Sequence, residues 1–177
     1  MNIFSKRLQI VKDDTLLSVV RDIPFFGELT RREIREIVDV LQIQSFEPKE
    51  EVFTQGQPGL GMFIVTSGKV EIVQAEEDGS ERVLSEADSG SFFGEMALLD
   101  DAARSATARA VEKTELAAFY RSDLLALAEE QSQLGVKIIM YLSQVVAERL
   151  RRTNRSLKEV RDELESVKVD SEEVDGA

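Results

Sequence analysis

One stretch of the chain combines residue types that could bind a phosphorylated ligand. Gly94 and Glu95 precede Ala97 to Leu99, which favour a single helical turn, and Arg104 follows ten residues after Gly94. The free N–H groups at the start of such a turn attract an anion, and glycine lets the backbone approach it closely. An arginine fork suits two phosphate oxygens, whereas a carboxylate accepts a hydrogen bond from a sugar hydroxyl. Together these groups predict a site for a sugar phosphate.

The composition excludes several other kinds of chemistry. The 177 residues include neither cysteine nor histidine, which removes thiol nucleophiles, disulfides, Ser-His triads and imidazole-bearing zinc sites. The net charge of −12 disfavours generic binding to nucleic acid or to anionic membranes. No apolar run is long enough for a transmembrane helix or a signal-peptide core. We therefore expect a cytoplasmic protein that is not an enzyme and has no membrane span.

The pattern of apolar, turn-forming and charged residues changes along the chain and predicts four regions. They are an N-terminal helical segment over residues 1–29, a β-roll over 30–120, C-terminal helices over 121–167 and an acidic disordered tail over 168–177. Thr30 and Glu33 have the capping-box spacing, and Ile34, Ile37 and Val38 follow at helical spacing, so a helix is expected to begin there.

Short β-prone runs separated by turn clusters follow from Phe46 onward. The turns recur about every ten residues, a spacing typical of an antiparallel sandwich, barrel or jelly roll. Asp78 and Gly79 predict a two-residue hairpin turn, because both residues tolerate positive φ. The expected fold is therefore mainly β, with flanking helices.

The segment from Gln133 to Val167 contains no proline and predicts one helix of roughly 50 Å. One heptad register gives eight apolar residues among ten a and d positions, namely Val136, Ser143, Leu150, Leu157 and Leu164 at a, and Ile139, Val146, Thr153, Val160 and Val167 at d. A sustained seam of this kind predicts a parallel homodimer. The alternative is a lone amphipathic helix packed on its own β-roll, and Ile138, Leu142 and Val145 widen the apolar face as that packing would require.

The residues from Phe93 to Leu99 and from Arg104 to Thr107 resemble the phosphate-binding cassette of cyclic-nucleotide-binding domains. The glycine turns of Gln55–Gly59 and Phe63–Val70 match the early strands of that family, and the resemblance covers about residues 23–160. It implies a β-roll, or jelly-roll, nucleotide-binding domain followed by a long dimerisation helix. It also implies that the protein is a cyclic-nucleotide receptor.

The resemblance assigns roles to individual residues of the cassette. Glu95 would accept the ribose 2′-hydroxyl and Arg104 would pair with the cyclic phosphate. The backbone of Gly94, Met96 and Ala97 would line the same pocket. Ser105 follows the arginine, where family members carry Ala, Thr or Ser, and serine there favours cAMP over cGMP.

The segment from Met140 to Asn154 resembles the central helix of the catabolite activators in the same family. This implies that Thr153 and Asn154 reach the adenine across the dimer and that Arg149 lies beside the base. Asn154 departs from the serine of that family but can still donate and accept hydrogen bonds. Thr153 could equally be a plain seam residue. The basic residues from Arg149 to Arg161 are more simply a solvated helix flank than a nucleic-acid patch.

Other functions remain open from the sequence. The chain could be a dimerisation or partner-binding module without nucleotide binding, or a transcriptional regulator. The ten residues after Val167 are too few and too acidic for a helix-turn-helix domain, so we expect no DNA binding. Asp100 and Asp101 are expected to form a solvated turn rather than a metal site. An unknown protein effector is possible as a downstream partner.

Overall fold

The computed structural model describes residues 16–23 and 26–175, with side chains placed as far as Glu165. Contacts divide the chain into two units, Met1–Leu142 and Ser143–Ala177. The division falls within helix α4 (Ser132–Asp175) and not at residue 121, where the sequence suggested a change of region. Of the expected N-terminal helical segment, residues 16–22 are helical. A helix before them would lie outside the described residues.

Helix α2 (Arg31–Val40) begins at the predicted capping box. The Thr30 hydroxyl accepts a hydrogen bond from the backbone N–H of Glu33 at 3.3 Å, and the Thr30 N–H donates to the Glu33 carboxylate at 2.7 Å. These bonds satisfy two donors that the start of a helix leaves without partners. Ile34, Ile37 and Val38 are buried, as their helical spacing predicts.

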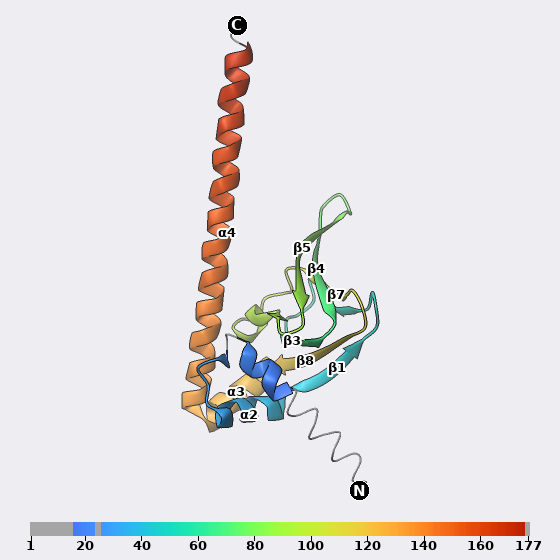
Figure 1. Cartoon of the computed structure of the whole chain (residues 1–177), viewed down its shortest axis with the longest axis vertical. Helices are drawn as coiled ribbons and strands as arrows, with labels where there is room; N and C mark the ends of the chain where they lie inside the picture. The colour runs from blue at the N-terminus through green and yellow to red at the C-terminus, as the bar shows by residue number, and fades with distance from the viewer. Residues whose placement is uncertain (1–15, 24–25, 176–177) are drawn as a thin grey trace. The chain divides into compact units, whose positions relative to one another are not determined.

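Two antiparallel sheets form the β-roll (Figure 1). One sheet has the strand order β1-β8-β3-β6 and the other β2-β7-β4-β5. The strands are β1 (Gln42–Phe46), β2 (Glu51–Phe53), β3 (Gly61–Ser67), β4 (Lys69–Ala75), β5 (Glu81–Asp88), β6 (Phe92–Phe93), β7 (Thr107–Ala110) and β8 (Thr114–Tyr120). This arrangement confirms the β-roll that the turn spacing predicts.

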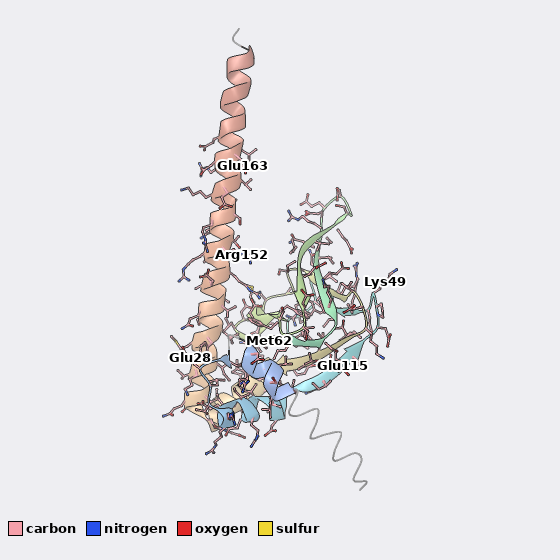
Figure 2. The ribbon with its side chains drawn as sticks, viewed as in Figure 1. Glu28, Lys49, Met62, Glu115, Arg152 and Glu163 are labelled. Carbon is pink, nitrogen blue, oxygen red and sulfur yellow. The ribbon has the colours of Figure 1, made fainter. Side chains whose placement is uncertain are left out.

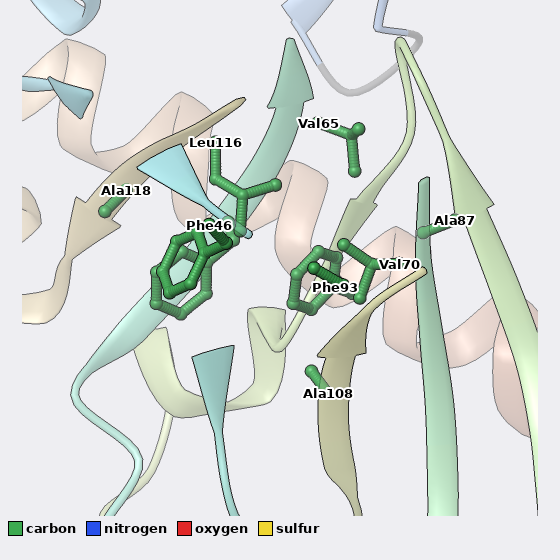
Figure 3. Close-up of a cluster of buried hydrophobic side chains, with 10 residues drawn as sticks. Phe46, Val65, Val70, Ala87, Phe93, Ala108, Leu116 and Ala118 are labelled. Carbon is green, nitrogen blue, oxygen red and sulfur yellow. The ribbon is translucent and has the colours of Figure 1, made fainter. Parts of the chain in front are cut away.

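The hydrophobic core lies between the two sheets, because each sheet contributes buried side chains to one cluster (Figure 3). Large residues alternate with alanines across this cluster, which lets the sheets approach closely. Its buried members are Phe46, Phe63, Val65, Val70, Ala87, Phe93, Ala108, Ala110, Leu116 and Ala118. Phe93 ends β6 and precedes Gly94 directly, so the core fixes the chain where the glycine and acid of the predicted site begin.

The hairpin between β4 and β5 has a three-residue loop and not the predicted two-residue turn. Glu76 N–H donates to Ser80 C=O at 2.9 Å, and Gly79 N–H donates to Glu76 C=O at 3.0 Å. Only Gly79 takes a positive φ in this loop, of 84°, which is typical of a type I turn followed by a left-handed residue. Asp78 instead accepts a hydrogen bond from the Ser80 N–H at 2.9 Å, and this local bond favours the longer loop.

Helices α3 (Arg121–Glu130) and α4 follow the last strand. Leu134, Ile138 and Leu142 of α4 are buried. A Cβ at Gly135 would lie 2.4 Å from the Cβ of Ala128, so glycine is needed for the close approach of α4 to α3. The side chains of Arg152 and Glu163, further along α4, project from the helix (Figure 2).

The end of α4 corrects the prediction of a disordered tail over 168–177. The helix continues to Asp175, so that prediction is wrong for residues 168–175, while 176–177 lie outside the described residues. Extending an existing helix needs no new nucleation, and lysine and glutamate are good helix formers. Among the described helices, none combines the length and hydropathy needed to cross a bilayer.

An ion pair joins α2 to α4 and should make the free energy of unfolding depend on pH. Lys137 Nζ lies 2.6 Å from Glu33 Oε1, and this bond, with the Thr30 N–H, lowers the pKa of Glu33 to about 2. Because the folded-state pKa lies below the ordinary value of 4.5, the stabilisation is present above about pH 4.5 and is lost as the pH falls through about 2. We expect Glu33→Gln to lower the free energy of unfolding by about 0.5–1 kcal/mol at pH 7.

Urea unfolding of wild type and Glu33→Gln from pH 7 down to pH 2.5 measures this contribution. The difference between the two proteins should shrink below pH 4.5. Glu77→Gln, in the exposed β4–β5 loop, controls for the loss of one charge and should show no such trend. A difference that stayed constant down to pH 2.5 would contradict the ion-pair explanation.

Candidate functional site

A single helical turn begins the site, as the sequence predicts. The 3₁₀ turn η2 (Glu95–Leu98) follows Gly94, whose φ is +73°. That left-handed conformation is strained for residues with a side chain. Glu95 is 1% exposed, whereas Met96 is 54% exposed, so the turn places its acid inside the β-roll and its methionine on the surface.

The guanidinium of Arg104 lies beside Gly94, the residue that precedes this turn. Arg104 Nη1 donates to the Gly94 carbonyl oxygen at 3.2 Å, and Nη2 donates to the Gly61 carbonyl oxygen at 2.6 Å. The guanidinium carbon also lies 4.0 Å from the centroid of the Phe53 ring. Three separate segments of the chain therefore hold one cationic group in place.

The electrostatics of Arg104 suit an anionic ligand. Burial lowers the pKa of Arg104, while the negative charge of Glu95 acts in the opposite direction. An arginine remains a cation even when partly buried. Its Nε–H is buried and has no hydrogen-bond acceptor among the described residues. The site thus contains a partly desolvated cation with a donor that the protein does not satisfy, which fits a bound phosphate.

Backbone hydrogen bonds fix the main chain of Arg104. Its N–H donates to the Gln57 carbonyl and its carbonyl accepts from the Gly56 N–H, both at 2.8 Å. A Cβ at Gly59 would lie 2.8 Å from the Cβ of Ala97, so glycine is needed where this turn approaches η2. The glycine turn after β2 therefore positions the arginine.

The structure brings together most of the residues that the sequence singles out in the first unit. Gly94, Glu95 and Ala97 surround the start of η2, and Arg104 contacts Gly94 directly. Ser105 is exposed, and its carbonyl oxygen lies 3.5 Å from Gln74 Nε2. The structure shows that these residues lie close together, and their roles in ligand binding remain predictions.

The two aspartates of the predicted solvated turn have protein partners. Asp100 Oδ1 accepts from the Ala102 N–H at 3.3 Å, and Asp101 pairs with Arg121. Within the described part of the chain, no group of three or more acidic side chains is arranged to hold a metal ion.

Arg149, Thr153 and Asn154 belong to the second unit. All three are exposed on α4, and the Thr153 hydroxyl donates to the Arg149 carbonyl oxygen at 3.0 Å. Their participation in a ligand site stays a prediction.

Sequence reasoning missed two groups of the site. Phe53 reads as an ordinary strand residue, and Gly61 contributes through its carbonyl oxygen. A backbone carbonyl has no sequence signal. The structure shows why residue 61 is a glycine, because a Cβ there would lie 2.3 Å from the Phe119 carbonyl oxygen.

The chain is similar to several known proteins. Residues 43–131 match the family model described as a cyclic nucleotide-binding domain. A cyclic AMP receptor protein of Thermus thermophilus is 36% identical over 134 residues, which are 76% of this chain and 60% of that protein. A cAMP-dependent protein kinase regulatory subunit of Mycosarcoma maydis is 35% identical over 94 residues, which are 53% of this chain and 18% of that protein.

Solved structures show the same fold. The crystal structure of the Thermus thermophilus catabolite activator protein has a TM-score of 0.70 and 35% identity, and the match covers 77% of this chain and 62% of that chain. This chain belongs to the cyclic nucleotide-binding domain family. It spans less than two thirds of the length of each of these relatives.

Gly94 offers a test of the site's geometry. A Cβ there would lie 2.8 Å from Arg104 Nη1, whereas a Cβ at Gly90, whose φ of +83° is similar, meets nothing within 4 Å. Gly90→Ala should therefore cost only the backbone strain of about 1–2 kcal/mol. Gly94→Ala should destabilise the fold by more than Gly90→Ala, because it also displaces the guanidinium. Urea unfolding of both variants measures the difference, and equal losses would contradict the contact.

Proposed function

We propose that this protein is a receptor that binds cAMP between η2 and Arg104 and signals through a homodimer formed by α4. The observation that carries the proposal is the guanidinium of Arg104. It is partly buried beside Gly94, and the negative charge of Glu95 raises its pKa against the effect of burial. Its Nε–H has no acceptor among the described residues. A buried cation of this kind favours an anionic group placed against it.

The cyclic nucleotide supplies the chemistry that these groups lack. Its phosphate oxygens accept hydrogen bonds from the guanidinium of Arg104. Its ribose 2′-hydroxyl donates to Glu95, which is almost fully buried and so recognises the sugar away from water. The backbone of Gly94, Met96 and Ala97 lines the same pocket. The names of two relatives, a cyclic AMP receptor protein and a cAMP-dependent kinase regulatory subunit, support a cyclic nucleotide as ligand.

The base would distinguish cAMP from other cyclic nucleotides. Ser105 favours cAMP over cGMP in this proposal. Thr153 and Asn154 of the partner helix, with Arg149 beside them, complete the base side. The protein binds and releases its ligand without chemistry and acts as a sensor, not an enzyme. A cytoplasmic location stays a prediction from the sequence, and so does an unidentified protein effector.

The exposed face of α4 supports the homodimer. Four apolar residues at the predicted a and d positions, Leu150, Leu157, Val160 and Leu164, are between 52% and 67% exposed in the single chain. Apolar side chains repeated at heptad spacing favour a second helix with the same register. A parallel partner buries them and would place its Thr153 and Asn154 toward the nucleotide.

Removing the phosphate-binding and ribose-binding groups tests the proposed pocket. We expect Arg104→Ala to weaken cAMP binding by at least about tenfold to a hundredfold, since a hydrogen bond to a charged group contributes about 1.5–3 kcal/mol. Glu95→Ala should cause a loss of similar size. Titration calorimetry measures both, and Arg32→Ala, an exposed arginine of α2, serves as the control. Unchanged affinity in both pocket variants would contradict the assignment.

The coiled-coil face predicts a dimer coupled to ligand binding. A variant with Leu157→Asp and Leu164→Asp should be monomeric in sedimentation, because each of the two chains would place two carboxylates in the buried seam. It should also bind cAMP more weakly, by a coupling of typically about 1–3 kcal/mol.

The matched control introduces aspartates at the adjacent b positions, Arg151→Asp and Lys158→Asp, and should remain dimeric. A monomeric wild type would contradict the homodimer. A monomeric double variant with wild-type affinity would contradict the coupling alone.

A further inference from the structure

The aromatic ring of Phe53, beside Arg104, is not expected to contact the ligand in the proposed pocket. The guanidinium carbon lies 4.0 Å from the centroid of the Phe53 ring. Phe53 ends the short strand β2 and is half-buried. An arginine over an aromatic face is attracted by the negative charge density of that face, and the attraction grows when the pair is removed from water. The contact therefore does more than fill space.

The ring itself is held by two other aromatic side chains. Phe53 lies 5.9 Å from Phe63 and 5.9 Å from Phe93, and Phe63 and Phe93 lie 5.6 Å apart, all measured between ring centroids. The three rings come from β2, β3 and β6, and Phe63 and Phe93 belong to the buried core. Phe53 is thus a fixed platform at the edge of that core.

The platform and the two carbonyl acceptors restrain different motions of the arginine. The hydrogen bonds to Gly94 and Gly61 act in the plane of the guanidinium, whereas the ring blocks one of its two faces. Arginine loses more rotamer freedom than most side chains when it is fixed. A guanidinium that is already fixed loses little more when an anion arrives, and this preorganisation increases affinity.

We infer that Phe53 is a positioning residue, which holds the guanidinium of Arg104 in its ligand-binding orientation before any ligand is present. An aliphatic residue could fill part of the same volume, but it has no π face to attract the cation. The consequence for affinity rests on the proposed function, while the positioning itself is a property of the protein alone.

Binding measurements test the consequence for affinity. Fixing one long side chain is worth about two- to tenfold in affinity, so Phe53→Leu should weaken cAMP binding by that factor. Phe53→Tyr keeps the ring and should bind cAMP with wild-type affinity. Phe53→Met offers an unbranched and more flexible side chain that also lacks a π face. It should weaken binding by the same factor, and it replaces Phe53→Leu if that variant does not fold. Phe46→Leu, in the buried core of β1, controls for a general loss of packing.

A double-mutant cycle tests whether Phe53 acts through Arg104. Phe53→Leu should cause no further loss of cAMP affinity in an Arg104→Gln background, as measured by competition up to millimolar ligand. An equal loss in both backgrounds would overturn the positioning role and leave the proposed function intact. No effect of Arg104→Gln itself would instead contradict the proposed function.

The ligand-free protein provides a readout that is independent of nucleotide. The Nε–Hε NMR resonance of Arg104 should be shifted by the ring current in wild type and in Phe53→Tyr. It should move to the position of a mobile arginine in Phe53→Leu. A resonance unchanged by Phe53→Leu would overturn the inference, whether or not the protein binds cAMP.

Discussion

The cost of burying one cation shapes the centre of this protein. Arg104 is partly removed from water, and the desolvation of a guanidinium must be offset by hydrogen bonds and favourable contacts. Gly61, Gly94 and Phe53 provide these from three strands or strand ends, and the glycine turn after β2 fixes the main chain of the arginine. Gly59 and Gly94 follow from this requirement, because the chain must approach η2 and the arginine closely there.

Most of the site could be predicted from sequence, because its side chains have recognisable chemistry at recognisable spacing. Gly94 indicates a close backbone approach, Glu95 an acid and Arg104 a cation. Phe53 could not be found in this way, since a phenylalanine at the end of a strand is usually a core residue. The carbonyl of Gly61 could not be found either, because every residue carries one and only the folded chain decides which carbonyl faces the arginine.

The fold was predictable to a similar depth. Turn spacing indicated the β-roll, and the capping box at Thr30 marked the start of α2. The hairpin at Gly79 differed in loop length because local hydrogen bonds to Asp78 favour a longer turn. The end of α4 differed because acidic composition was taken as disorder, although glutamate and lysine extend an existing helix readily. Local interactions explain both the longer hairpin loop and the longer helix, and a pattern of residue types does not give the free energies of those interactions.

Helix α4 carries two kinds of apolar residue. Leu134, Ile138 and Leu142 are buried in the first unit, whereas Val136, Ile139 and Met140 are largely exposed in the same turns. The two sets interleave at helical spacing. One stretch of helix can therefore pack on its own domain and still present a second apolar face to solvent.

The pairing of β1 with β8 has a consequence for how the protein acquires its pocket. Gln42 lies opposite Ala118 and Phe46 opposite Thr114, so this sheet pairs two strands that are separated by most of the β-roll sequence. Closing such distant contacts is slow and entropically demanding. The groups around Arg104 lie within that intervening sequence and converge only when the sheets have closed. The site around Arg104 therefore exists only in the folded β-roll, and a ligand that needs it would bind the native state alone and raise the melting temperature with the logarithm of its concentration above Kd.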